Sequence, residues 1–463
     1  MSSNSNEAPL GIEARLAREA RDLAVKRADP SSAYFAGDAP VRADRRRFVL
    51  QSMAALGGTA GVMRNAFAET GVGATVHDVP ADASKTPGYP LADESYGTRS
   101  QFETEVRRRF KTPTPLSSWT MTPLEAGCGI ITPSGLHFER SHAGTAVIDA
   151  SAHSLYVHGM VREPRKYSMK DLRRFPSISR IMFLECSGNG LTEWSKPTMR
   201  TVQFTHGLTS TSEWTGVPLA TILKEAGLQR GAKWLLAEGG DAAAMTRSIP
   251  LAKAMKDCFV AYGQNGEAIR PEQGYPLRLM VPGCEGNMHI KWLRRIEVSD
   301  APFMTREETS KYTDLLPSGK AVQFSFEMEA KSVITSPSGE MTLDGPGFHE
   351  ITGIAWSGRG AIRRVDVSID GGKTWRNAAL QSPVLPICHT RFRMPWRWDG
   401  GPTMLQNRAW DESGNFQPTR SEFVAVRGET KTVPNVAGFP NQHYNSITSW
   451  GVDAKGEIKH VYA

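Results

Sequence analysis

The stretch Ile181-Met-Phe-Leu-Glu-Cys186-Ser-Gly-Asn-Gly190 carries the strongest structural signal in the sequence. Its apolar half predicts a short buried strand, and residues 187–190 are turn formers that let the backbone approach a ligand closely. A cysteine at a strand end is most often a small core residue. Beside a glycine turn, however, its thiolate can reach a bound cofactor. The residue types in the neighbouring loops decide between these interpretations of Cys186.

The composition limits the class of protein. With 463 residues, of which 40% are hydrophobic and 22% charged, the chain is long enough for two or three globular domains. The formal net charge of +7 comes without basic runs interleaved with aromatic residues, so it does not indicate nucleic-acid binding. No segment reaches the ~18 uninterrupted apolar residues of a membrane-spanning helix, and we expect no membrane span.

The five cysteines lie far apart in the sequence, at Cys128, Cys186, Cys258, Cys284 and Cys388. They form no C-x-x-C pair, which argues against a zinc ribbon, and no C-x-x-C-H motif, which argues against haem c attached to this chain. Because their number is odd, at least one thiol stays unpaired even in an oxidising compartment. Cys186 is the candidate for that thiol.

An export signal is predicted within residues 1–68. Residues 44–50, Asp-Arg-Arg-Arg-Phe-Val-Leu, precede a modest apolar stretch and then Ala66-Phe-Ala68. This pattern resembles a twin-arginine signal with an A-x-A cleavage site, although an arginine-rich helix start is the alternative. The twin-arginine route carries folded proteins, so we expect a periplasmic protein that takes up a complex cofactor before export.

Two domains are predicted beyond this signal. Residues 69–125 are rich in Pro, Gly and Thr and indicate a segment that wraps around the protein. In residues 126–326 strand-like runs alternate with helices, which predicts a mixed α/β domain. Its best-marked helix begins near Pro218, carries an apolar stripe and stops at Gly227.

In residues 327–430 the sequence pattern changes to one of strands and turns. Apolar residues at period two are followed by Asp370-Gly-Gly372, a hairpin turn, which predicts an immunoglobulin-like β-sandwich. The fold class is therefore α+β. Residues 431–463 have few periodic positions and indicate a C-terminal tail that lies along another surface.

Several loops that follow strands carry the polar residues that a large anionic cofactor needs. Each residue alone is more often a solvated charge or a satisfied structural group. The loops hold Phe138, Glu139, Arg140, Ser141 and His142, then Asp241, Tyr262 and Arg278, and finally His289, Ile290 and Lys291.

Their combination and order resemble the sulfite oxidase family of molybdenum enzymes over about residues 136–300. The resemblance continues in the sandwich, which is similar to that family's dimerisation domain through Gly353-Ile-Ala-Trp-Ser-Gly358 and Arg408-Ala-Trp-Asp411. It implies a Mo-molybdopterin cofactor with Cys186 as the thiolate ligand of molybdenum. It also implies that these loop residues other than Tyr262 contact the pterin, that Tyr262 orients an oxo or water ligand, and that Arg140 contacts an anionic substrate. Gln273 stands where the family usually has histidine, so one cofactor contact is altered or lost.

Departures from the family pattern concern the substrate. Gly190 and Leu191 stand where the sulfite-oxidising members carry arginine, and His443 stands at the position of another substrate-binding arginine. A buried sulfite dianion needs fixed positive charge to offset its desolvation. We therefore expect Gly190, Leu191 and His443 to give a less positive substrate pocket, similar to that of sulfane dehydrogenases of periplasmic thiosulfate oxidation.

The resemblance implies a reaction and partners. Protein-bound sulfane sulfur on a cysteine of a sulfur-carrier protein is oxidised, and the electrons leave singly through a haem c cytochrome subunit. A homodimer through the β-sandwich, within a heterotetramer, is also implied. The alternatives are a sulfite:cytochrome c oxidoreductase of the same fold and a non-enzymatic binding protein in which the sandwich does the work.

Overall fold

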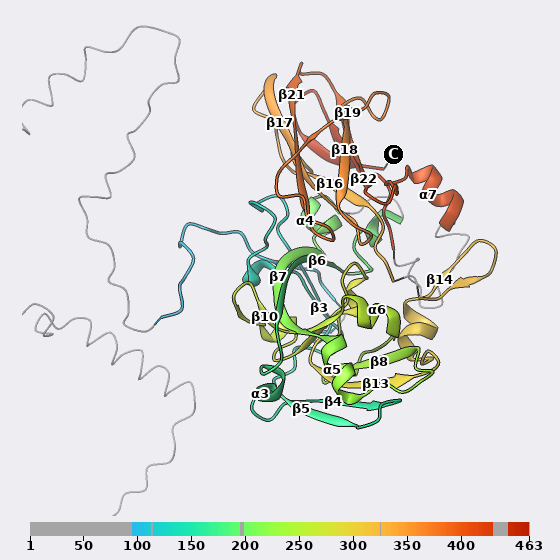
Figure 1. The fold of residues 1–463 in the computed structure, drawn as a ribbon. Coiled ribbons are helices and arrows are strands. Elements are labelled where there is room, and N and C mark those ends of the chain that lie inside the picture. Colours follow the sequence, from blue (N-terminus) through green and yellow to red (C-terminus); the bar gives the residue numbers. More distant parts are fainter. Residues whose placement is uncertain (1–94, 113, 195–198, 325, 429–442, 463) are drawn as a thin grey trace, which may run out of the picture. The chain divides into compact units, whose positions relative to one another are not determined.

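The computed structural model describes residues 95–112, 114–194, 199–324, 326–428 and 443–462, and residues 99–463 form one compact unit (Figure 1). The predicted extension and export signal, residues 1–68, lie outside the described residues. Within the described part of the chain, no helix has the length and apolar character needed to cross a membrane.

The first domain is built from two β-sheets that share one apolar core. The strand order in one sheet is β11 (Glu267–Ala268), β10 (Phe259–Gln264), β7 (Thr209–Pro218), β6 (Ile178–Glu185), with β12 (Arg278–Met280) also pairing with β10. The order in the other is β5 (Arg165–Ser168), β4 (Ser154–Gly159), β13 (Leu293–Ser299), β8 (Trp234–Gly239), β9 (Thr246–Pro250). Only the pairing of β4 with β13 is parallel among the described strands of these sheets. The mixed α/β prediction is confirmed.

Short helices connect these strands. Helix α5 (Leu219–Ala226) has the predicted ends, since Pro218 caps its N-terminus and Gly227 takes the left-handed conformation at φ 74° after its last turn. Its apolar stripe is fully buried in the core that joins both sheets. The other helices are α3 (Met169–Leu172), α4 (Val202–His206), α6 (Leu251–Lys256), η4 (Ser134–Leu136), η5 (Leu191–Trp194), η6 (Pro271–Gln273), η7 (Gly286–Met288) and the π-helical turn η8 (Glu307–Lys311).

Strand β6 delivers Cys186 to the surface of the core, as the opening stretch predicts. It pairs with β7 along its whole length, from Ile178 opposite Gly216 to Glu185 opposite Thr209. Directly after Glu185 the chain turns, because the Asn189 amide donates to the Cys186 carbonyl at 2.9 Å and Gly190 takes φ 85°. Glycine is needed at that last position, since an L-residue there pays for a left-handed backbone.

Residues 69–94 of the predicted wrapping segment lie outside the described residues, and the described part of 95–125 contributes to a small sheet. Strands β1 (Arg108–Arg109) and β2 (Ser118–Met121) pair with each other, and β2 pairs with β3 (Glu139–Ser141). A hairpin of β14 (Asp314–Leu315) and β15 (Ala321–Val322) precedes the second domain.

The second domain is the predicted β-sandwich, drawn in orange and red in Figure 1. One sheet has the order β16 (Lys331–Ser336), β17 (Gly347–Trp356), β21 (Thr390–Trp398), β20 (Ala379–Leu380). The other has the order β19 (Arg376–Asn377), β18 (Ile362–Ser368), β22 (Thr403–Asp411), β23 (Ser449–Val452), β24 (Ile458–Val461). Trp356, Trp396 and Trp398 are buried in its core.

The C-terminal segment differs from the prediction of a surface tail. After helix α7 (Arg420–Arg427), residues 449–461 add strands β23 and β24 to the sandwich. Their strand form is set by pairing with β22, which lies about forty residues earlier in the chain, and local periodicity gives little sign of it.

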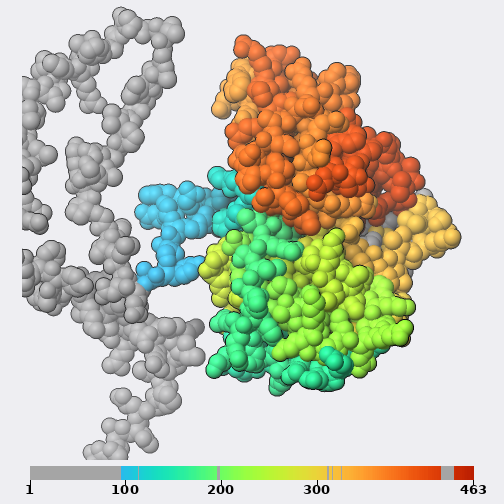
Figure 2. Space-filling model, in the orientation of Figure 1, coloured from blue at the N-terminus to red at the C-terminus, as the bar shows by residue number. Residues whose placement is uncertain are grey.

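The two domains meet through a pair of glycines. A Cβ atom on Gly283 would overlap the carbonyl of Gly358, and a Cβ atom on Gly358 would overlap the carbonyl of Gly283. Met328 bridges them, because its amide donates to Gly283 at 2.9 Å and its carbonyl accepts from Gly358 at 2.8 Å. On the face shown in Figure 2, sandwich residues in orange accordingly lie directly against residues of the first domain.

We expect Gly283→Ala to destabilise the protein by about 3 kcal/mol or more, because it adds a steric overlap to the strain of a left-handed alanine. The matched control is Gly266→Ala, which has the same φ of 79° but open space around the new methyl group. That control should cost only about 1 kcal/mol. Thermal unfolding of both variants measures the difference, and equal midpoints would contradict the close approach of the two domains.

Candidate functional site

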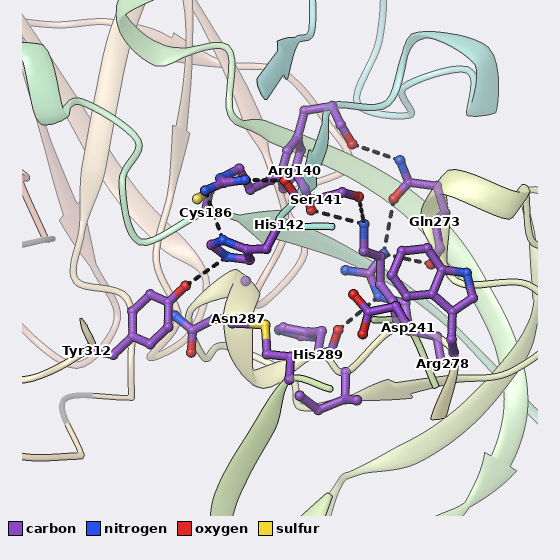
Figure 3. A pocket seen from close by; sticks show the side chains of 16 residues that line it. Arg140, Ser141, His142, Cys186, Asp241, Gln273, Arg278, Asn287, His289 and Tyr312 are labelled. Carbon is purple, nitrogen blue, oxygen red and sulfur yellow. Dashed lines mark hydrogen bonds between the residues drawn. The ribbon is translucent and has the colours of Figure 1, made fainter. Parts of the chain in front are cut away.

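A pocket in the first domain gathers segments that lie far apart in the sequence (Figure 3). Every residue predicted to contact the cofactor lines it except Glu139. The complete lining is Phe138, Arg140, Ser141, His142, Cys186, Asp241, Met245, Gln273, Arg278, Gly286, Asn287, His289, Ile290, Lys291, Trp292 and Tyr312. Sequence reasoning missed Met245, Gly286, Asn287, Trp292 and Tyr312 as lining residues.

Cys186 stands at one end of this pocket. Burial raises the pKa of its thiol, while the charge of Arg140 and the backbone of Gly188 act in the opposite direction. The net shift is upward, so the thiol by itself is protonated at neutral pH, and a bound metal ion would be needed to hold it as a thiolate. The backbone of Gly286 packs closely against it, since a Cβ atom there would lie 3.2 Å from the Cys186 Cα atom.

Arg140, His142 and Tyr312 form a hydrogen-bonded chain beside Cys186. Arg140 Nη2 lies 3.1 Å from His142 Nδ1, and His142 Nε2 lies 3.5 Å from the Tyr312 hydroxyl. Since an arginine can only donate, His142 Nδ1 accepts and its Nε2 carries the proton. Burial raises the pKa of Tyr312, so its hydroxyl stays protonated and able to donate towards the pocket.

The structure corrects the assignment of Tyr262. That residue lies in β10, where alternation turns its ring into the core between the two sheets and against Arg173, whose Cζ atom lies 5.7 Å from the ring centre. The tyrosine beside Cys186 is Tyr312, which follows the η8 turn and whose amide donates to the Glu307 carbonyl at 2.9 Å. Neither a strand nor a glycine turn marks Tyr312 in the sequence, and the buried acidic pair Glu307 and Glu308 is its only local signal.

Arg278 and Gln273 stand at the other end of the pocket, near Asp241 in Figure 3. Arg278 donates from Nη1 to the Gln273 side-chain oxygen at 3.0 Å and from Nε to the His289 carbonyl at 3.3 Å. The Gln273 amide nitrogen in turn donates to the Phe138 carbonyl at 2.8 Å. Gln273, which departs from the family pattern, therefore orients Arg278 and links it to residues 138–142.

His289 and Lys291 are held by protein groups. The Val281 amide donates to His289 Nδ1 at 3.1 Å, and Nε2 lies 3.1 Å from the Cys284 carbonyl, so both ring nitrogens are engaged. Burial lowers the pKa of His289 to about 3 and leaves the ring neutral. His289 thus offers the pocket a ring face and no charge.

The ammonium group of Lys291 is also engaged with protein groups. Its ammonium lies 2.9 Å from the Arg140 carbonyl, 2.7 Å from Ser141 Oγ and 3.0 Å from the Glu272 carbonyl. Burial lowers the pKa of Lys291 to about 7. The fixed positive charge of the pocket therefore comes mainly from Arg140 and Arg278, whose guanidinium groups stay protonated.

Glu139 lies behind the pocket wall. Its carboxylate accepts from Ser118 Oγ at 2.8 Å and lies 3.9 Å from Lys291 Nζ, so it supports the wall and does not face a ligand.

Gly190, Leu191 and His443 are not among the lining residues, which corrects their predicted place in the substrate pocket. Leu191 packs against the aromatic cluster of Trp194, Phe423 and Tyr444, and a Cβ atom on Gly190 would lie 3.4 Å from the Tyr444 ring. The three positions are therefore neighbours in space. Leu191 and the aromatic cluster form an apolar surface against Gly190.

His443 is held by an acidic residue. Its Nε2 lies 3.3 Å from Glu329 Oε2, and Arg427 Nη2 lies 3.2 Å from the same oxygen. Burial alone would raise the pKa of Glu329, but His443 and Arg427 outweigh it and lower this pKa to about 2. His443, which stands where an arginine was expected, thus holds the C-terminal segment against Glu329.

The lining residues fit the expected cofactor. A single soft thiol at one end suits molybdenum, while a guanidinium, a carboxylate and backbone groups at the other end suit a phosphate and the polar edge of a pterin ring. Among these side chains, Arg140 and Arg278 are already fixed by protein hydrogen bonds. Cys186 would bind the metal, and Arg278, Asp241 and the 138–142 segment would bind the pterin.

Comparisons with known proteins agree with this class of site. Residues 142–307 match the model of the oxidoreductase molybdopterin binding domain, and residues 322–434 match that of the Mo-co oxidoreductase dimerisation domain. Fold and pocket thus define a molybdopterin-dependent oxidoreductase.

Individual relatives narrow the class. The solved structure of the sulfane dehydrogenase SoxCD from Paracoccus pantotrophus is similar with a TM-score of 0.78 and 43% identity, covering 82% of this chain and 96% of that chain. Mitochondrial sulfite oxidase of Rattus norvegicus is 33% identical over 62% of this chain and 57% of its own length, and a nitrate reductase of Cichorium intybus is 32% identical over 72% and 40%. The match thus spans only part of these last two proteins. The chain belongs to the sulfite oxidase family of molybdenum enzymes.

We expect Tyr312→Phe to lower the turnover of the cofactor-loaded enzyme about tenfold or more, because it removes a hydroxyl beside Cys186. Tyr262→Phe is the matched control and should leave turnover unchanged, since that hydroxyl lies outside the pocket. Steady-state assays of both variants at equal molybdenum content measure this. If Tyr262→Phe lowered turnover and Tyr312→Phe did not, Tyr262 would be the tyrosine that acts at the site.

Glu329→Gln tests the acidic clamp on His443. Because the pKa of Glu329 is lowered in the folded state, its carboxylate stabilises the fold fully above pH ~4.5, and this contribution is lost as the pH falls towards 2. The variant should therefore lose about 2 kcal/mol of unfolding free energy at neutral pH and much less at pH ~3. Urea denaturation at both pH values measures this. Glu350→Gln, which alters an exposed carboxylate, should show no such pH dependence.

Proposed function

We propose that this chain oxidises sulfane sulfur bound to a carrier protein and passes the electrons to a haem c cytochrome. The arrangement of Arg140 is the observation that carries the proposal. Its Nη1 is engaged with the Ser141 carbonyl and its Nη2 with His142, so a free dianion would compete with these two contacts for the guanidinium. Gly190 and Leu191 contact apolar and aromatic residues, so neither supplies the positive charge beside Cys186 that a sulfite dianion needs.

The roles of the residues follow from their positions. When bound, the molybdenum cofactor supplies oxygen-atom transfer to sulfur and accepts two electrons. Cys186 holds the metal, and Arg278, kept in place by Gln273, holds the pterin end. The Tyr312 hydroxyl, protonated through burial, donates a hydrogen bond to the reacting end of the site. Arg140 and His142 fix the orientation of that hydroxyl.

Oxidation of free sulfite is the second candidate. Mitochondrial sulfite oxidase is 33% identical to this chain, and Arg140 still places one positive charge near Cys186. In this alternative the Arg140 guanidinium would have to leave the Ser141 carbonyl and bind the dianion.

Partners and location are part of the proposal. The match to a dimerisation domain supports a homodimer through the sandwich, and the likeness to SoxCD supports a heterotetramer with a cytochrome subunit. The twin-arginine pattern of residues 44–50 supports export to the periplasm in the folded state.

Substrate competition separates the two candidates. We expect the molybdenum-loaded protein to turn over a carrier protein with a persulfidated cysteine at least tenfold more efficiently, as kcat/KM, than free sulfite, with cytochrome c as the acceptor. Cys186→Ser should lose both molybdenum and activity, whereas Cys128→Ser, which alters an exposed cysteine, should lose neither. Efficient turnover at low micromolar sulfite would instead establish the second candidate.

A further inference from the structure

The carboxylate of Glu185, the residue directly before Cys186, is fully buried among hydrogen-bond donors. Its Oε1 accepts from Lys331 Nζ at 2.6 Å and from Asn189 Nδ2 at 2.9 Å, and its Oε2 accepts from Trp356 Nε1 at 2.7 Å. Since these three neighbours all donate, the carboxylate is present in its ionised, acceptor-only form.

Two of the donors come from the sandwich. Lys331 lies on β16 and Trp356 on β17, and these two residues stand directly opposite each other in the antiparallel pair. Cross-strand neighbours share one face of a sheet, so the sandwich presents a cation and an indole N–H side by side to the two oxygens of one carboxylate.

The same groups hold the far side of the Cys186 turn. Lys331 Nζ also lies 3.2 Å from the Asn189 carbonyl, and the Asn189 side-chain oxygen accepts from the Leu208 amide at 3.1 Å. The Asn189 amide closes the turn by donating to the Cys186 carbonyl at 2.9 Å. Residues on both sides of Cys186 are therefore anchored to one lysine, which is 1% exposed.

We propose that Glu185, Lys331 and Trp356 form a clamp by which the sandwich positions the Cys186 thiolate and sets the reduction potential of the metal it binds. This inference rests on the proposed function, because it takes Cys186 to be the metal ligand. It makes the sandwich part of the redox site, in addition to any part it has in dimerisation.

The charges themselves indicate a role beyond stability. Removing a carboxylate and an ammonium from water costs several kcal/mol per ion, and apolar residues of similar volume often stabilise a protein equally well. A fixed negative charge next to a metal ligand favours the oxidised metal, and a fixed positive charge favours the reduced metal. Glu185 thus lowers the reduction potential and Lys331 raises it, although the two side chains contact each other.

The test uses Glu185→Gln, Lys331→Met and the double variant in the molybdenum-loaded full chain. Potentiometric titration followed by electron paramagnetic resonance of Mo(V) measures the midpoint potential, and metal analysis gives the molybdenum content. We expect Glu185→Gln to raise the potential, Lys331→Met to lower it, and the double variant to lie between them. The Mo(V) spectrum should change in both single variants because the thiolate moves.

Two further variants serve as a substitute for Lys331→Met and as a control. Trp356→Phe removes one N–H donor with little change of shape and should lower the potential slightly, which replaces Lys331→Met if that variant does not fold. Lys253→Met breaks a partly buried ion pair elsewhere, with Asp257 at 2.8 Å and outside the pocket lining, and should leave both potential and spectrum unchanged.

Opposite outcomes have distinct meanings. If the clamp variants retain full molybdenum with unchanged potential and spectrum, or shift the potential in the same direction, the clamp only supports the fold. If the unaltered protein binds no molybdenum, or Cys186→Ser retains the Mo(V) signal, the ligand assignment fails independently of the clamp.

Discussion

The buried ion pair between Glu185 and Lys331 is the contact on which the site depends most. It lies between the last residue of β6 and the first residue of β16 in the sandwich, at 2.6 Å, with both side chains excluded from water. Loss of either partner leaves an uncompensated charge in the interior, which typically costs 3–5 kcal/mol. The turn that carries Cys186 therefore shares the rigidity of the sandwich, although it belongs to the other domain.

Other pocket residues are also held by protein groups before any ligand binds. Arg278, His289 and Lys291 each bind protein carbonyls, amides or side chains, so their orientations are set before any ligand enters. A preformed site loses little side-chain entropy on binding, which favours tight retention of a large cofactor. The departure at Gln273 fits this arrangement, since glutamine both accepts from Arg278 and donates to the Phe138 carbonyl.

Local patterns in the sequence were enough to predict the strand and turn around Cys186, helix α5 and the β-sandwich, and the resemblance to the sulfite oxidase family predicted most of the pocket lining. Glycine turns and strand ends are encoded by neighbouring residues, so they are readable one segment at a time. Tyr312 was missed because it follows a π-helical turn without a period of its own. His443 and Leu191 were misplaced because the contact of His443 with Glu329 and the packing of Leu191 against Tyr444 depend on partners distant in sequence.

The clamp also has a consequence for biosynthesis. Lys331 and Trp356 follow Glu185 by 146 and 171 residues, whereas the last pocket-lining residue is Tyr312. On the ribosome, every residue of the pocket is therefore made before the groups that hold the Cys186 turn. A prematurely terminated chain would contain the full lining and still present an unsupported cysteine. Lys331 and Trp356 can therefore contact Glu185 only after the first strands of the sandwich have been synthesised.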